Sequence, residues 1–158
     1  MITFKLPKEL PTTACVFEIS IGDKYYIGKS SNLLFVKTEI QTTYGKYNRK
    51  GLLETNLFYP VAKEIHKQEK PIVEIKVLFA SSNGYDVLKF ELCQLSEHFG
   101  QKNCLNLNNI PHIPKTVIAK KGSNWLTQNQ ALNFRKLLTK YNRSEEHTSE
   151  LQSLRHIS

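Results

Sequence analysis

The chain has 158 residues, of which 40% are hydrophobic and 23% are charged, and its formal net charge is +8. This length suits one hydrophobic core with an appendage, and the composition excludes a disordered chain. No apolar run approaches the roughly 18 residues of a membrane span. The first residues have no long apolar run after their charge, so we expect no secretory signal. We therefore expect a cytoplasmic protein that does not enter a membrane.

The excess of lysine and arginine favours a polyanionic partner, and nucleic acid is the commonest polyanion that a cytosolic protein meets. A basic surface that only keeps the protein in solution explains the charge equally well. The three cysteines lack paired metal-ligand spacing, so we expect reduced core thiols.

The first predicted element is a β-hairpin. Residues 14–21 are rich in strand formers, Gly22-Asp23 follows as a turn, and residues 24–28 return as the second strand. Ser30 or Ser31 is the expected N-cap of a helix. Its apolar positions recur at helical spacing: Leu33, Val36, Ile40 and Tyr44.

The following elements are separated by loops that contain glycine or proline. Residues 45–51, with two glycines, are predicted to form a loop. The elements then expected are a helix over 57–68 with Pro60 in its first turn, a strand over 71–79, a turn over 81–84, a helix from Asp86 to Gly100, a linker over 110–114 and an amphipathic helix over 126–141. The expected fold is α/β (α+β), with a three-stranded antiparallel sheet flanked by helices in the order strand-strand-helix-helix-strand-helix, followed by a C-terminal helix.

The segment from residue 143 to 158 is expected to be foreign to the natural protein, because it resembles a translated sequencing adapter of metagenomic origin. Without this tail the chain carries a net charge of +9, so the tail does not create the basic character. The expected domains are residues 1–109, a linker and helix over 110–142, and the tail over 143–158.

Four landmarks in chain order resemble the GIY-YIG nuclease family. The segment Lys24-Tyr25-Tyr26-Ile27-Gly28-Lys29 is similar to the second family motif, and the first motif falls on Cys15-Val16-Phe17. Glu91 matches the carboxylate of the third family helix, and Asn106 matches a recurrent asparagine near the end of the domain. The resemblance covers about residues 12 to 108 and implies a nuclease domain over 1–109.

The resemblance implies hydrolysis of DNA with one divalent metal ion, Mg²⁺ or Mn²⁺. Such a cation prefers carboxylate oxygen and keeps several waters, so Glu91 alone can be its protein ligand. Tyr26 is then the general base or a donor that orients the water, Lys29 contacts phosphate, and Asn106 supports the site. In the alternative interpretation Glu91 and Lys29 are solvated surface residues and Tyr26 packs as an ordinary aromatic residue of a strand.

Two family positions are replaced by apolar residues. Phe17 stands where the first motif has its tyrosine, and Val36 stands where the first helix has an arginine. Losing a proton-transfer group typically lowers a rate about 10²–10⁴-fold, and losing one charge-stabilising donor lowers it about 10²–10³-fold. Lys37 is next to Val36 but about 100° around the helix, so it is an imperfect substitute.

Aromatic residues alternate with cations in the segment after the first helix, which suits contact with phosphate and stacking on bases. The candidate DNA-binding residues are Lys37, Lys46, Tyr47, Arg49 and Lys50. A solvated loop is the alternative there. The Arg135-Lys136 helix is a candidate accessory DNA contact, together with Lys115, Lys120, Lys121 and Trp125. An amphipathic helix that packs back onto the nuclease core is the alternative there.

The sequence therefore predicts a metal-dependent DNA endonuclease of the GIY-YIG type, impaired at two positions and of phage or mobile-element origin. We expect it in the cytoplasm of a bacterium or phage-infected cell and, although the sequence does not fix the oligomeric state, as a monomer. The alternative function is a catalytically inactive nucleic-acid-binding protein with the same fold, and the third is an interaction module without a nucleic-acid role.

Overall fold

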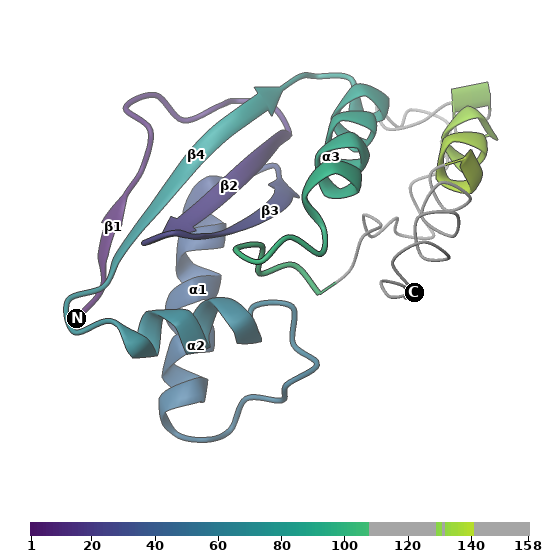
Figure 1. Cartoon of the computed structure of the whole chain (residues 1–158). Coiled ribbons are helices and arrows are strands. Elements are labelled where there is room, and N and C mark those ends of the chain that lie inside the picture. Colours follow the sequence, from purple (N-terminus) through teal and green to yellow (C-terminus); the bar gives the residue numbers. More distant parts are fainter. Residues whose placement is uncertain (108–128, 131, 141–158) are drawn as a thin grey trace.

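The computed structural model describes residues 1–107, 129–130 and 132–140, and contains a four-stranded sheet (Figure 1). The strands are β1 (Thr3–Lys5), β2 (Cys15–Ile21), β3 (Lys24–Ser30) and β4 (Ile72–Ala80), in the spatial order β1-β4-β2-β3. The α+β class is confirmed. The predicted three-stranded antiparallel sheet is wrong, because β1 pairs with β4 in parallel and makes the sheet mixed.

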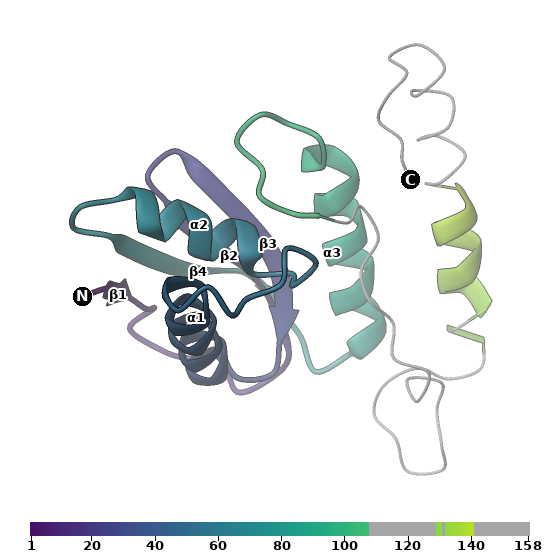
Figure 2. The ribbon, with the colours of Figure 1, turned by 90° about the horizontal axis from the view of Figure 1, so that it is seen from below.

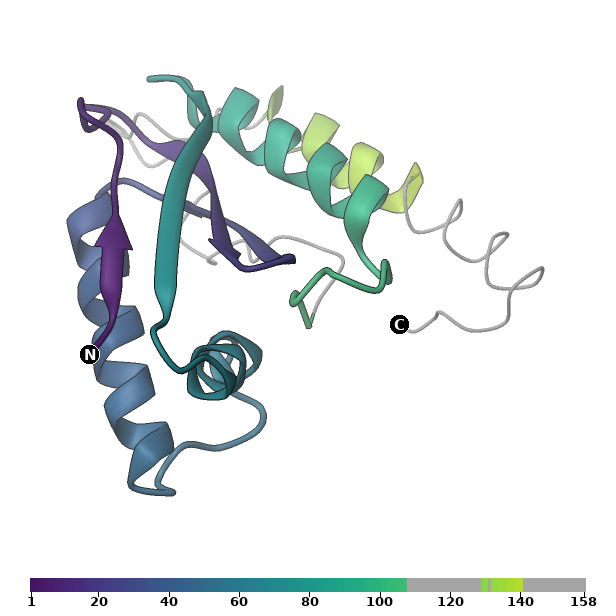
Figure 3. The same ribbon diagram turned by 60° about the vertical axis from the view of Figure 1, so that its left-hand side comes forward.

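β1 escapes prediction because it is only three residues long and has no alternating pattern that a single sequence reveals. It lies beside β4 with Phe4 opposite Val73, and both strands are seen edge by edge in Figure 3. Phe4 packs against the main core, so this short strand extends the sheet at the edge away from β3.

The hairpin of β2 and β3 is confirmed. Ile21 pairs with Lys24, which leaves Gly22 and Asp23 as the two loop residues. Gly22 has φ 60, a value that glycine adopts without strain and that the first position of a type II′ turn needs. The pairing continues to Cys15 and Ser30.

Helix α1 (Leu33–Asn48) begins one residue later than the predicted caps allow. Asn32 is its N-cap, because its side-chain oxygen accepts hydrogen bonds from the backbone N–H groups of Leu34 and Phe35. The predicted loop over 45–51 is partly wrong, since Gly45 to Asn48 form the last turn of α1.

The remaining elements have close to their predicted bounds. Helix α2 (Tyr59–Lys67) carries Pro60 in its first turn. Backbone N–H groups in the first turn make no hydrogen bond within the helix, so proline is tolerated there. Asn83 is the N-cap of helix α3 (Gly84–His98), because its side chain accepts from the Tyr85 N–H, so the helix begins before the predicted Asp86.

The two faces of the sheet are covered by different helices. One face packs against α1 and α2 through a core that includes Phe17, Ile19, Val36 and Ile65. The other face packs against α3 through a cluster of Val16, Ile27, Val87 and Leu95. Figure 2 shows α1 and α2 together on one side and α3 beyond β3. Strand β3 is therefore an edge strand that meets both layers.

Residues 129–130 and 132–140 are helical, in agreement with the predicted C-terminal helix, and lie beside α3 (Figures 1 and 3). Phe134 is buried against Leu88 and Leu92 of α3. The predicted linker over 110–114, the tail over 143–158 and four accessory DNA-contact residues lie outside the described residues: Lys115, Lys120, Lys121 and Trp125.

Candidate active site

A cavity of about 770 Å³ lies beside β3, where the two layers meet. Its walls come from β2, β3, α1, α3, the segment before α2 and the segment after α3. Three predicted site residues line it together: Tyr26 and Lys29 from β3 and the distant Glu91 from α3. Asn106 and the replaced positions Phe17 and Val36 line the same cavity.

Alternation along β3 decides which layer each side chain enters. Tyr26 lies opposite Ile19, and Gly28 lies opposite Phe17, so these residues share the face that packs on α1 and α2. Lys29 lies opposite Val16, a residue of the cluster that faces α3. The edge strand thus delivers Tyr26 and Lys29 to the cavity from opposite faces of the sheet.

Asn106 closes the outer edge of β3. Its side-chain oxygen accepts a hydrogen bond from the Ile27 N–H at 2.9 Å, and its side-chain nitrogen donates to the Ile27 carbonyl at 2.7 Å. The amide thereby satisfies two backbone groups of a buried residue as a neighbouring strand would. This is the arrangement that structural support of the site requires.

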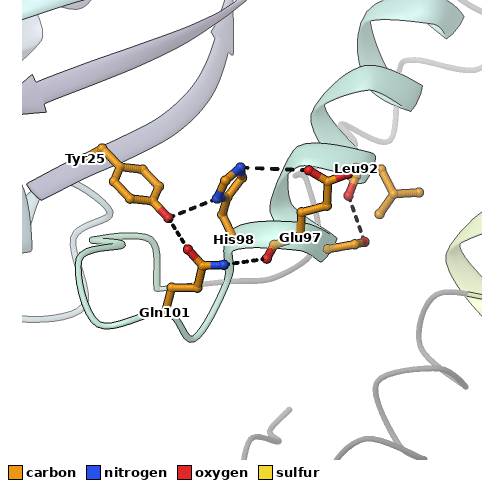
Figure 4. Close-up of polar contacts among 6 residues, drawn as sticks. Tyr25, Leu92, Glu97, His98 and Gln101 are labelled. Atoms are coloured by element: carbon orange, nitrogen blue, oxygen red, sulfur yellow. Dashed lines mark hydrogen bonds and ion pairs between the residues drawn. The ribbon is translucent and has the colours of Figure 1, made fainter.

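A second contact fixes the segment that carries Asn106. The Tyr25 hydroxyl lies 3.0 Å from His98 Nδ1 and donates to Gln101 Oε1 at 3.0 Å, and Figure 4 shows this cluster at the end of α3. The backbone N–H of Tyr25 donates to the Asn103 carbonyl, and the Leu105 N–H donates to the Tyr25 carbonyl. The segment after α3 is therefore bound to β3 at Tyr25 as well as at Ile27.

Glu91 is a buried carboxylate. It belongs to the buried stripe of α3 together with Val87, Leu88 and Leu95, and it is 5% exposed, which excludes the alternative of a solvated glutamate. Its Oε1 atom lies 3.4 Å from Lys29 Nζ as an ion pair but has no hydrogen bond of ordinary geometry with the described residues.

Burial raises the pKa of the Glu91 carboxyl, and the Lys29 ammonium offsets part of that increase. The Lys29 side chain is 17% exposed, so it is not the solvated lysine of the alternative interpretation. The Glu91 Oε1 atom without a hydrogen bond is an oxygen of the kind that hard divalent cations bind.

Tyr26 is 8% exposed and packs edge-on against Phe58, with ring centroids 5.2 Å apart. Burial, together with the negative charges of Glu91 and Glu39, raises the pKa of its phenol far above the ordinary value. The phenol therefore stays protonated near neutral pH. Of the two predicted roles, this favours a donor that orients water and disfavours a general base.

Phe17 and Val36 are apolar walls of the cavity, 2% and 3% exposed. A Cβ atom built on Gly28 would lie 2.8 Å from Phe17 Cζ and 3.1 Å from Tyr26 Cε1. Only a residue without a side chain permits this close approach. The Phe17 ring thus lies directly over the backbone of the second motif and contributes no polar group.

Glu39 is a residue of this cavity that the sequence analysis missed. It follows Val36 by one helical turn, lines the cavity and contributes to the raised pKa of Tyr26. The signal available in the sequence was its spacing of three from Val36. The charged side chains of the lining are therefore two carboxylates, Glu39 and Glu91, and one lysine, Lys29.

The chemistry of this lining fits a hard divalent cation. A buried carboxylate oxygen without a hydrogen bond and a second carboxylate in the same cavity are oxygen ligands of the kind that Mg²⁺ and Mn²⁺ prefer. Within the described residues, no group of three or more His, Cys, Asp or Glu side chains is arranged to hold a metal. Glu91 would be the principal protein ligand, with water completing the coordination.

The predicted DNA-binding residues do not gather at this cavity. Lys37 lies over the Phe4 ring, 5.5 Å from its centroid, and is absent from the lining, so it does not replace the missing arginine. The Tyr47 ring packs against the rings of Tyr59 and His66, so it is already in contact with two aromatic side chains. The cations Lys46, Arg49 and Lys50 are exposed at and just after the end of α1.

No protein-family description, curated protein or solved structure matches this chain in comparisons with known proteins. In the part of the chain that the structure describes, no helix is long and apolar enough to cross a membrane.

Proposed function

We propose that this protein is a metal-dependent DNA endonuclease of the GIY-YIG type, which hydrolyses phosphodiester bonds. One observation carries the proposal: Tyr26, Lys29 and Glu91 come from two elements about 60 residues apart and line a single cavity. Their order and spacing match the family motifs. Burial of Glu91 raises the pKa of its carboxyl, as is common for functional carboxylates.

Each residue has a role that its surroundings support. Glu91 would hold the cation, Lys29 would contact the phosphate once its ion pair with Glu91 is relaxed, and the protonated Tyr26 hydroxyl would orient the attacking water. When bound, the metal supplies positive charge that polarises the phosphoryl group and stabilises the transition state. The two carboxylates of the lining would repel a phosphate, so a cation is needed for DNA to approach.

A catalytically inactive nucleic-acid-binding protein is the second candidate, and the packing of Phe17 and Val36 favours it. Both side chains are buried where the family has a tyrosine and an arginine. Without those groups the cavity lacks two of the donors that would act on the phosphate and the water. The basic chain and the exposed cations after α1 would remain available for binding.

The test is nicking of supercoiled plasmid by the full chain in Mg²⁺ or Mn²⁺. The variants Glu91→Gln and Tyr26→Phe remove one polar function each, and Glu97→Gln is a matched control because it changes an exposed glutamate of the same helix. We expect nicking by the wild type and the control and at least 10²-fold less with Glu91→Gln. Equal background in all four proteins would exclude the enzyme, and salt-sensitive DNA binding without nicking would support the second candidate.

The two replaced positions allow a gain-of-function test. Phe17→Tyr combined with Val36→Arg restores a hydroxyl and a cation at the wall of a cavity that Glu39 and Glu91 also line. We expect the nicking rate to rise at least tenfold. An unchanged rate in a folded double variant would show that these positions do not correspond to the family residues.

The partner in this proposal is DNA, and the protein would act as a monomer in the cytoplasm of a bacterium or phage-infected cell. The formal charge of +8 supports a polyanionic partner. The molar mass measured by sedimentation, with and without DNA, tests whether the protein is a monomer.

A further inference from the structure

Apolar side chains line the mouth of the cavity although they remain open to solvent. Phe35, Leu57 and Leu107 are 59%, 47% and 42% exposed, and all three belong to the cavity lining. They come from α1, from the segment before α2 and from the segment after α3. Apolar surface that gathers at a cavity from separate segments is typical of a binding site.

The fold does not need Phe35. The buried residues of α1 are Leu33, Val36, Ile40 and Thr43, and Phe35 lies off that stripe. Its aromatic ring is therefore available to a ligand. Phe58, on the segment before α2, adds a second ring to the lining and is itself braced against Tyr26.

The lining divides into an aromatic part and a charged part. The rings of Phe35 and Phe58 form the first, with Leu57 as an aliphatic neighbour in the lining, while Lys29, Glu39 and Glu91 form the second. A nucleotide has the same division, because it joins a flat base with an aromatic face to a charged phosphate. A volume of about 770 Å³ has room for one such unit.

We propose that this cavity takes one unpaired nucleotide, with its base stacked on Phe35 and its phosphate beside Lys29, so that the preferred DNA carries a single-stranded extension next to a duplex. This inference rests on the proposed function and specifies its substrate. A base inside a duplex has to be unpaired and unstacked before it can enter, whereas an unpaired base avoids that cost. Stacking on an aromatic ring accepts any base, so the preference is for structure and not for sequence.

The net charge of the chain selects this occupant over an apolar peptide. A chain of +8 attracts a polyanion, and the lysine inside the cavity gives the phosphate a specific partner.

The experiment measures binding of the full chain by fluorescence anisotropy, with Ca²⁺ in place of Mg²⁺ to slow cleavage. Three labelled hairpin DNAs are compared: a blunt hairpin, the same hairpin with a single-stranded extension, and one whose extension has the same phosphates but abasic sugars. The extended DNA is expected to bind roughly 5- to 100-fold more tightly than the other two, the range for stacking of one base.

Two neighbouring residues of α1 give a matched pair of variants. Phe35→Ala removes the ring from the cavity, and Leu34→Ala removes a side chain that is 50% exposed but is absent from the lining. Both are surface changes, so both variants are expected to fold. The preference for the extended DNA is expected to disappear in Phe35→Ala, to persist in Leu34→Ala and to persist in Phe35→Trp.

The outcomes separate this inference from the proposed function. Equal binding of the three DNAs, or an equal loss in Phe35→Ala and Leu34→Ala, overturns the inference, and nicking that depends on Glu91 would then still support the endonuclease. Binding to none of the DNAs at low salt overturns both. Retention of the preference with the abasic extension overturns the stacking and assigns the contact to phosphate alone.

Discussion

Replacing Gly28 by alanine would place a methyl group where the Phe17 ring now lies. The added Cβ would be 2.8 Å from Phe17 Cζ and 3.1 Å from Tyr26 Cε1, both shorter than van der Waals contact. Both rings are buried, at 2% and 8% exposure, so neither can move freely into solvent. Inserting a methyl group into such packing typically costs about 1–3 kcal/mol.

The expected result is a loss of about 1–3 kcal/mol in the free energy of unfolding, measured by urea denaturation. Gly45→Ala is the control, because Gly45 lies inside α1 and its added Cβ would meet only the end of the Arg49 side chain at 3.4 Å. Alanine is the better helix former there, so this control should gain roughly 0.5–1 kcal/mol.

A double-mutant cycle identifies the cause. Phe17→Leu shortens the ring side chain and removes the Cζ atom that Gly28→Ala would strike. The double variant should therefore be more stable than the two single losses predict, by at least about 0.5 kcal/mol. A coupling energy near zero, or a Gly28→Ala variant as stable as the wild type, would refute the placement of Phe17 over the second motif.

Three further predictions concern the polar residues of the cavity. Lys29→Met leaves the buried Glu91 without its cation and should lower the free energy of unfolding by about 1–3 kcal/mol at pH 7. Burial raises the pKa of Glu91, so this loss of stability should shrink as the pH falls through that pKa and the carboxyl is neutralised. Asn106→Ala deprives the Ile27 N–H and carbonyl of their partners and should cost about 2 kcal/mol, with faster amide exchange at Ile27. The nicking rate should rise with pH as Glu91 ionises and show no further rise up to about pH 10 from Tyr26, whose pKa is raised by burial.

Each of these predictions has a control. Lys63→Met changes an exposed lysine and should show no pH-dependent loss; an equal pH dependence in both variants would contradict the buried pair. Asn103→Ala keeps the backbone carbonyl that binds Tyr25, so protection of the Ile27 amide should persist. A second, alkaline limb of the rate that disappears in Tyr26→Phe would reinstate Tyr26 as a general base.

The hairpin and the helices followed from local patterns. The apolar alternation of residues 15–21 and the Gly22-Asp23 turn were sufficient to define β2, β3 and their register, because a two-residue turn fixes the pairing. The N-cap of α1 was less predictable, because Ser30, Ser31 and Asn32 are all residues that cap helices. Only the residue at which the helix begins, Leu33, decides for Asn32. Gly45 was expected to end the helix, but α1 continues through it and packs on α2.

The site was predictable where a motif named a residue and unpredictable where tertiary packing decides. The motif resemblance named Tyr26, Lys29 and Glu91, and the structure brings all three to one cavity. The resemblance does not reveal that Glu91 itself is one of the buried residues of α3. Glu39 and Phe35 line the cavity because of how α1 packs in the folded protein, which local sequence patterns do not encode. Tyr47 looked free to stack on a base, whereas its ring packs against Tyr59 and His66.

The central claim is that the Glu91 carboxylate makes this cavity a metal-dependent site for cleaving DNA. The ratio of plasmid-nicking rates between the wild-type chain and Glu91→Gln, at saturating Mg²⁺, tests it most directly. The account predicts a ratio of at least about 10², with the Glu97→Gln control close to the wild type. A ratio near one, with both proteins folded and nicking above background, would contradict it.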